Sequence, residues 1–167
     1  MKNWQILVAI PAVAITASAS MAQEAAPLAW PTEHRCLLSS PAESGTPRLY
    51  LEIIQRTDEK SEKNDFIQIR LLVNEALDQG QQAKFENGSI SIKGFADWTG
   101  LTFNGRPNGT NYLLAANLPH EASAVLGPIE GGSTLTATVP TTEGSKVYDV
   151  SLKGSAKAVA AVRRCMS

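Results

Sequence analysis

The chain has 167 residues, with 15 basic and 16 acidic side chains and a formal net charge of −1. This balance argues against nucleic acid or an anionic membrane surface as a partner, because both attract strongly basic proteins. The length suits one domain with a sizeable hydrophobic core.

The first 22 residues have the three parts of an export signal in the required order. Lys2 supplies a positive charge, residues 6–15 are apolar, and the small residues Ser20 and Ala22 suit a signal peptidase. We therefore predict cleavage before Gln23 and a periplasmic or secreted protein of a Gram-negative bacterium. A membrane anchor is the weaker alternative, because a spanning helix needs about 20 apolar residues. No second apolar run of that length follows, so we expect no membrane span.

The two cysteines, Cys36 and Cys165, both belong to the predicted mature chain. An even number of cysteines in an exported protein predicts a disulfide between them. Two free thiols would require a reducing compartment, which the export signal contradicts. A redox role would favour a C-x-x-C spacing, which is absent.

Residues 23–47 are predicted to be irregular, ahead of a β-rich domain at 48–167. Four prolines and a Ser/Gly-rich patch at 39–46 argue against regular structure in this segment. We expect Trp30 and the region of Cys36 to pack onto the domain.

Two strands are predicted at 48–56 and 66–74. The first is rich in β-forming residues, and the second alternates between apolar and polar side chains, with Ile67, Ile69, Leu71 and Val73 on one face. The charged connector 57–65 is short, so the two strands should pair as a hairpin with a solvated turn.

Shorter strands are predicted at 83–86, 89–93, 101–103 and 112–116. Asn87-Gly88 is a typical type I′ hairpin sequence, because both residues tolerate a positive φ. Asn104-Gly105 and Asn108-Gly109 indicate a further turn region at 104–111.

The C-terminal third predicts two helices that flank two strands. A helix at 119–126 should end at Gly127-Pro128, and a second at 155–164 should be capped by Ser155, with Ala156, Val159, Ala160 and Val162 on its apolar side. Strands are predicted at 133–139 and 146–152. The fold class is thus mainly β, an antiparallel β-sandwich with a short C-terminal helix and one disulfide.

The segment 117–163 also resembles a known family. It contains a short helix, the Gly131-Gly132 step, the strand LTATV, the Glu143-Gly144 turn, the strand VYDVSL, and a helix that opens with Gly154-Ser-Ala-Lys-Ala158. This order is similar to the closing segment of the invasion-associated locus B family, exported proteins of alphaproteobacteria. The resemblance implies a periplasmic or envelope-associated β-sandwich, and it carries no catalytic residues.

The motifs of common active sites are missing from the sequence. The two histidines are His34 and His120, and the position four residues after His120 is Ala124, so the paired histidines of a zinc helix are absent. There is no G-x-S-x-G, no Walker loop and no G-x-G-x-x-G. We predict no catalytic residue, no metal and no cofactor.

Three residues are candidates for contacts with a partner. Asp97 and Trp98 could form part of a sugar- or peptide-binding face, although a core tryptophan beside a turn aspartate is the favoured interpretation. Arg106 lies in the predicted loop 104–111, the best candidate for an exposed contact loop, against the plainer interpretation of a surface turn.

Two functional hypotheses follow from these observations. The leading one is an exported, non-enzymatic binding or interaction protein whose partner is an envelope or extracellular protein, because binding residues concentrate on loops that a rigid scaffold holds. The alternative is a small secreted hydrolase that uses residues distant in sequence, with His120, Asp97 and Glu121 as candidates.

Overall fold

The computed structural model describes residues 5–8, 32–40, 47–57, 63–78 and 81–167. Most of the predicted export signal, its cleavage site at Ala22 and the predicted packing of Trp30 lie outside these residues.

The described residues form nine strands and two helices. In chain order these are β1 (Gln5–Val8), β2 (Thr32–Ser39), β3 (Arg48–Thr57), β4 (Lys63–Val73), β5 (Ala83–Ile92), β6 (Ala96–Asn108), β7 (Asn111–Leu118), α1 (Ala122–Gly131), β8 (Thr134–Thr141), β9 (Gly144–Ser151) and α2 (Ser155–Met166). The strands make one sheet in the order β1-β2-β3-β4-β7-β6-β5-β8-β9, and every neighbouring pair is antiparallel. The predicted mainly antiparallel β class with a C-terminal helix is confirmed.

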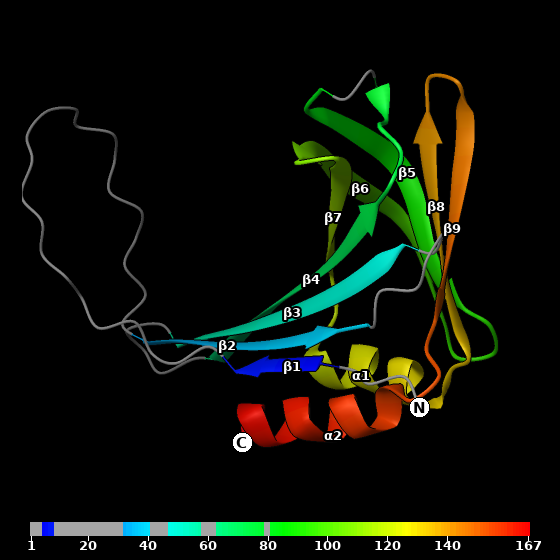
Figure 1. Ribbon diagram of the computed structural model, residues 1–167. Coiled ribbons are helices and arrows are strands. Elements are labelled where there is room, and N and C mark those ends of the chain that lie inside the picture. The colour runs from blue at the N-terminus through cyan, green and yellow to red at the C-terminus, as the bar shows by residue number, and fades with distance from the viewer. Residues whose placement is uncertain (1–4, 9–31, 41–46, 58–62, 79–80) are drawn as a thin grey trace, which may run out of the picture.

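The sheet curls strongly, so that β2 and β3 run along one side of the molecule while β8 and β9 rise along another (Figure 1). One face of the curled sheet carries the core. Register places Ile53 of β3 opposite Ile67 of β4, and Ile69 of β4 opposite Ala116 of β7; each of these side chains is at most 1% exposed. The predicted hairpin of the strands at 48–56 and 66–74 is confirmed as β3 and β4. We call the opposite face the outer face.

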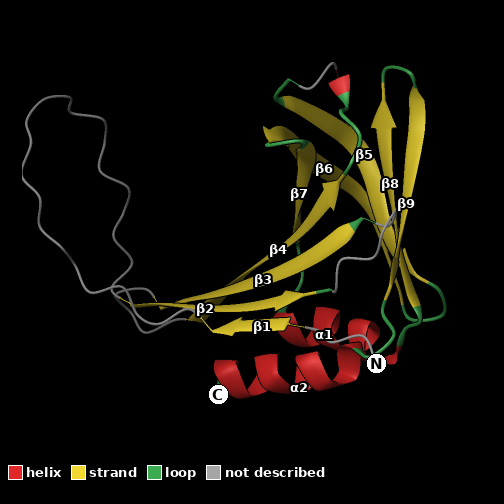
Figure 2. Ribbon diagram, viewed as in Figure 1, coloured by secondary structure: helices red, strands yellow, loops and turns green. Residues whose placement is uncertain are grey.

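The two helices pack against each other, and α2 also packs against β1 and β2 (Figure 2). In α2, Val159 and Val162 are buried as predicted, but the apolar side also includes Ala158, whereas Ala156 is exposed. The prediction that α1 ends at Gly127-Pro128 is wrong, because the helix continues to Gly131. Proline removes one intrahelical hydrogen bond, and burial of the following Ile129 favours the continued helix.

The predicted capping role of Ser155 is also wrong. Gly154, with φ of +86°, occupies the N-cap position of α2. The Ser155 hydroxyl instead donates a hydrogen bond of 2.6 Å to the carbonyl oxygen of Ile129, and the side chain is buried. This bond joins the start of α2 to the last turn of α1.

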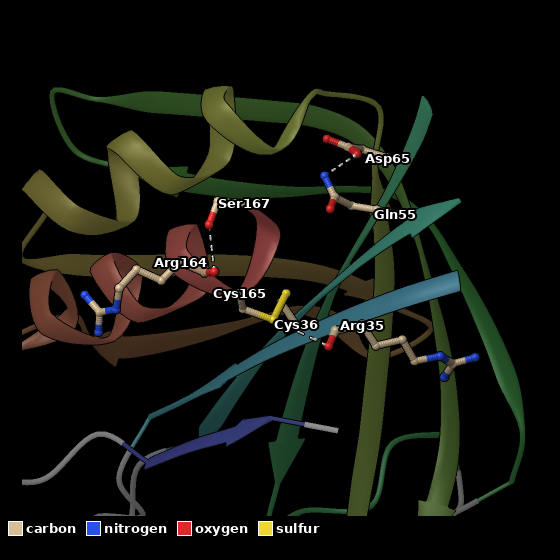
Figure 3. Close-up of a disulfide and its surroundings, with 7 residues drawn as sticks. All are labelled: Arg35, Cys36, Gln55, Asp65, Arg164, Cys165 and Ser167. Atoms are coloured by element: carbon tan, nitrogen blue, oxygen red, sulfur yellow. Dashed lines mark hydrogen bonds between the residues drawn. A yellow bond between two sulfur atoms is a disulfide. The ribbon is translucent and has the colours of Figure 1, made fainter. Parts of the chain in front are cut away.

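The predicted disulfide between Cys36 and Cys165 is present, with the two Cα atoms 6.1 Å apart. It links β2 to the last turn of α2, as Figure 3 shows. Cys36 is 1% exposed and belongs to the core, so the bridge fixes the helix on the core side of the sheet.

The prediction of irregular structure over residues 23–47 does not hold for Thr32–Ser39, which form β2. The prolines of this segment flank the strand and do not interrupt it. Between these prolines, Cys36 and Leu38 supply core side chains. The N–H of Ser40 continues the pairing with β3, because it donates a hydrogen bond of 2.9 Å to the carbonyl oxygen of Leu49.

The predicted hairpin at Asn87-Gly88 is wrong. One continuous strand, β5, runs through both residues, and its register against β6 shifts on either side of Gly88. Asn87 has the positive φ that its residue type tolerates, at +59°, but in a β-bulge and not in a turn. Gly88 is required because a Cβ there would lie 2.5 Å from the ring of Phe103.

The predicted turn at Asn104-Gly105 is wrong for a similar reason. Gly105 lies within β6, where a Cβ would meet the ring of Tyr112 at 2.5 Å. Residues 104–111 are therefore the end of the β6–β7 hairpin and not a long loop. The chain reverses only at Gly109-Thr110, which agrees with the predicted turn at Asn108-Gly109.

Candidate functional site

The outer face of β2, β3, β4 and β7 carries an unusual polar network centred on Glu52. Register places Glu52 opposite Leu37 on one side and Gln68 on the other, and Gln68 opposite Asn117. Arg70 comes from the adjacent row of residues on β4. These side chains lie on one face because they alternate with the core residues of the same strands.

Glu52 is only 7% exposed although it lies on the outer face. One carboxylate oxygen pairs with Arg35 Nη1 at 3.4 Å, and the other accepts a bond from Arg70 Nη2. Arg70 also donates to Gln68, whose amide donates 2.9 Å to Asn117 Oδ1. Two arginines therefore cover one buried carboxylate, and the network fixes their guanidinium groups on the surface.

We expect Arg70→Met to lower the free energy of unfolding by about 1–2 kcal/mol, because it leaves the buried Glu52 carboxylate with Arg35 alone. The expected loss is below the ~3–5 kcal/mol typical of breaking a buried pair. Arg70 and Arg35 have 35% and 50% exposed side chains, so solvent screens the charges. Chemical denaturation measures the effect.

Two comparisons make this prediction specific. Arg106→Met, also on the outer face but exposed, should change stability by less than about 0.5 kcal/mol. The double variant Glu52→Leu/Arg70→Met should be more stable than Arg70→Met, because it removes the uncompensated charge. A double variant less stable than the single one would contradict this explanation.

Aromatic and apolar side chains surround the network. The Arg48 guanidinium carbon lies 5.3 Å from the centroid of the Tyr50 ring, a cation–π contact. Half-buried aliphatic and aromatic side chains complete the surroundings: Leu37, Phe66, Leu72 and Leu113. Arginine and tyrosine among partly exposed apolar groups are the composition found at the centres of protein–protein interfaces.

A separate hollow of about 530 Å³ lies between the end of β4 and β9. Its wall includes Glu75, Tyr148 and Asp149. The Tyr148 hydroxyl donates 2.8 Å to one carboxylate oxygen of Glu75, and Lys146 Nζ lies 3.2 Å from the other. Glu75 and Tyr148 are 73 residues apart in sequence, so this contact ties two distant parts of the curled sheet together.

The hydrogen bond from Tyr148 is the main cause that lowers the pKa of Glu75. Burial, followed by the Glu75 carboxylate, raises the pKa of Tyr148 well above its usual range. The ionised carboxylate and the protonated phenol thus stabilise each other. This arrangement suits a structural contact better than acid–base catalysis near neutral pH, which needs a pKa near the working pH.

We expect the Glu75–Tyr148 contact to make stability depend on acid pH. A carboxylate with a lowered pKa stabilises the fold above its unfolded pKa of about 4.3, and this contribution is lost as the pH falls through the lowered value. The melting temperature of Tyr148→Phe should therefore be below that of the wild type near pH 6, and the difference should shrink towards pH 3. A difference in melting temperature that stays constant from pH 6 to pH 3 would contradict the assignment.

The structure separates the contact residues that the sequence suggested. Trp98 is 6% exposed on the core face, which agrees with the core interpretation, and its ring centroid lies 6.1 Å from that of His120. Asp97 is exposed and, as its neighbour in β6, projects to the other side of the strand. Arg106 is exposed on the outer face, linked to the Glu52 region by the register row Arg106–Leu113–Leu72–Arg48.

The residues of the hydrolase hypothesis come from two places in the fold, with Asp97 on β6 and His120 and Glu121 just before α1. His120 and Glu121 are exposed at the start of α1, and His120 faces the Trp98 ring. Within the described ranges, no three His, Cys, Asp or Glu side chains gather as metal ligands would. In the same part of the chain, no helix is both long and apolar enough to cross a membrane.

Sequence reasoning missed the Glu52 network, although a signal was present. Glu52 and Arg70 are single charges inside otherwise apolar stretches, LEII and IRLL, of two strands expected to pair. Opposite charges on paired strands are a recognised stabilising arrangement. Which face they share depends on register, and the register follows only from the structure.

Comparisons with protein-family models, curated proteins and solved structures found no match to this chain.

Proposed function

We propose that this chain is an exported, non-enzymatic binding protein of the cell envelope that recognises a protein partner through its outer face. The observation that carries the proposal is the buried Glu52 carboxylate, which holds Arg35 and Arg70 in place among half-buried apolar side chains and Tyr50.

The network reduces the entropic cost of binding. Free arginine side chains lose about 0.5–1.5 kcal/mol each when an interface immobilises them. Here Glu52 and Gln68 already restrain Arg70, so a partner's carboxylate or carbonyl groups meet a guanidinium that is partly oriented. Around it, Tyr50, Leu72 and Leu113 offer apolar surface for burial.

The compartment supports the same proposal. A disulfide between Cys36 and Cys165 is consistent with an extracytoplasmic protein. Together with the predicted export signal and the resemblance to the invasion-associated locus B family, it supports a proposed partner in the periplasm or at the cell surface. We include membership of that family in the proposal.

The test is affinity capture from an envelope extract of the native host, with the protein that starts at Gln23 as bait. A variant with Tyr50→Ala and Arg106→Ala removes two outer-face side chains outside the Glu52 ion pairs. A matched control, Lys157→Ala, removes an exposed charge from α2. We expect the wild type and the control to enrich the same partner, and the double variant to retain at most about a tenth of it, as loss of two interface anchors implies.

Thermal melting must first show that all three proteins are folded. Equal enrichment by the double variant would reject the outer face as the binding surface. Turnover in a broad hydrolase screen, with no partner enriched by the wild type, would reject the non-enzymatic function altogether.

A further inference from the structure

Strand β1 belongs to the segment predicted to be removed during export. Its four residues, Gln-Ile-Leu-Val, lie within the apolar part of the predicted signal peptide or next to it. In the structure they pair antiparallel with β2, from Gln5 opposite Ser39 to Val8 opposite Cys36. The chain before cleavage therefore fills a position at the edge of its own sheet.

The position of β1 has a defined shape, formed by β2 on one side and α2 on the other. Helix α2 contacts both strands, and Figure 1 shows it running beside β1. The disulfide from Cys36 to Cys165 fixes α2 to β2 independently of β1. Loss of β1 therefore leaves both walls attached to each other, and the backbone groups of β2 that face β1 lose their partners. We call this position the β1 seat.

Unpaired strand edges in a sheet bind other extended segments. The other edge of β2 is paired with β3 along its whole length, from Thr32 to Ser39, so the seat lies at the open end of the sheet order. Among the described residues, β1 occupies this position, and three of its four residues are apolar and two are β-branched. Core residues Cys36 and Leu38 of β2 alternate with Leu37 along the seat, so every second residue of an occupant lies on the core side.

We propose that the β1 seat of the cleaved protein binds an extended apolar segment of another polypeptide, which adds to the sheet as a strand antiparallel to β2. The proposal rests on cleavage at Gln23 and not on binding at the outer face. The outer-face network shares β2 with the seat, through Arg35 and Leu37, but it lies on the side of the sheet opposite the core. Specificity comes from alternate apolar side chains, and affinity comes from backbone hydrogen bonds to β2.

The probe is a fluorescent peptide with the sequence of residues 4–9, flanked by two lysines at each end for solubility. Two isomers carry N-methyl groups, one at the positions of Gln5 and Leu7, the other at Ile6 and Val8. In an antiparallel pair, alternate residues direct their N–H groups towards the partner strand. One isomer therefore loses its N–H hydrogen bonds to β2, and the other keeps them. The two isomers have the same composition and the same hydrophobicity.

Binding is measured by fluorescence anisotropy with protein from the native host whose intact mass begins at Gln23. We expect the unmodified peptide and one isomer to bind with affinities within about twofold of each other. The other isomer should bind at least about tenfold more weakly, because its N-methyl groups replace the N–H donors and leave carbonyl oxygens of β2 without a partner. Full-length Ala22→Leu, shown by mass to be uncleaved, should bind at least about tenfold more weakly because its own β1 fills the seat.

Several results would overturn the proposal. If native protein retains Met1, it still carries β1, and the seat is never open to another segment. Equal binding by the two isomers means that the peptide is held by hydrophobic contact alone. A stable dimer that the peptide does not dissociate means that a second copy occupies the seat. By contrast, the double variant Tyr50→Ala/Arg106→Ala should bind the peptide like the wild type even where it captures no envelope partner, and this result would separate the seat from the outer face.

Discussion

Reduction of the Cys36–Cys165 disulfide is expected to lower the melting temperature by about 10 °C. The bridge joins residues 129 positions apart, and a loop of this length stabilises a protein by nominally ~4–5 kcal/mol through the entropy of the unfolded chain. Measured values are usually smaller, and about 3 °C per kcal/mol applies to a domain of this size. The fold should survive reduction, because the core extends over every strand from β2 to β9.

Calorimetry with and without reductant measures this effect, and thiol titration confirms that reduction is complete. The variant Cys36→Ala/Cys165→Ala should melt near the temperature of the reduced wild type and should not respond to reductant. An unchanged melting temperature in wild-type protein with two titrated thiols would show that the bridge contributes nothing to stability.

Gly88→Ala should lower the free energy of unfolding by about 2–3 kcal/mol. The added Cβ would lie 2.5 Å from Cε2 of Phe103 and 2.9 Å from the carbonyl oxygen of Thr138. Phe103 is fully buried and Thr138 O belongs to the backbone of β8, so neither can move without disturbing the sheet. Overpacking of this kind typically costs about 1–3 kcal/mol. Urea denaturation measures the change.

The neighbouring Ser89→Ala adds no atom in the same strand and should stay within about 0.5 kcal/mol of the wild type. Phe103→Leu should destabilise the wild type but cost less in the Gly88→Ala background, because a smaller side chain relieves one of the two close contacts. Additive effects of the two substitutions would mean that the ring of Phe103 is not what excludes a side chain at Gly88.

Local patterns in the sequence predicted much of this fold. The alternation of Ile67, Ile69, Leu71 and Val73 placed one face of β4 in the core, and apolar spacing in α2 placed Val159 and Val162 there. Both patterns have the period of their element, and they depend on no distant residue. The disulfide was predictable because two cysteines allow a single pairing.

The errors came from local signals that distant residues override. Asn87-Gly88 has the composition of a hairpin turn, but its glycine accommodates the ring of Phe103 from β6, and Gly105 accommodates the ring of Tyr112 from β7. A glycine needed for close packing and one needed for a turn are identical in sequence. The strand at Thr32–Ser39 has a weak local signal, because prolines flank it and only three of its eight residues are apolar.

The candidate site was the least predictable part. The sequence predicts Arg106 in a loop, whereas it projects from a strand. Its relation to Arg48 depends on the pairing of β4 with β7, which are not consecutive in sequence. The sheet order β4-β7-β6 has no signature in composition or periodicity. Glu52 and Arg70 could be noticed as isolated charges, but their contact required the register.

The position of the two cysteines also sets the order of events during biosynthesis. A ribosome makes the chain from its N-terminus, so Cys36 is complete long before Cys165. The bridge can close only after residues 37–164 have been made and the final helix has reached β2. Until then Cys36 has no partner in its own chain, and no incorrect internal bridge can form. A molecule whose Cys36 is bonded to Cys165 is therefore one whose chain has been made at least as far as Cys165.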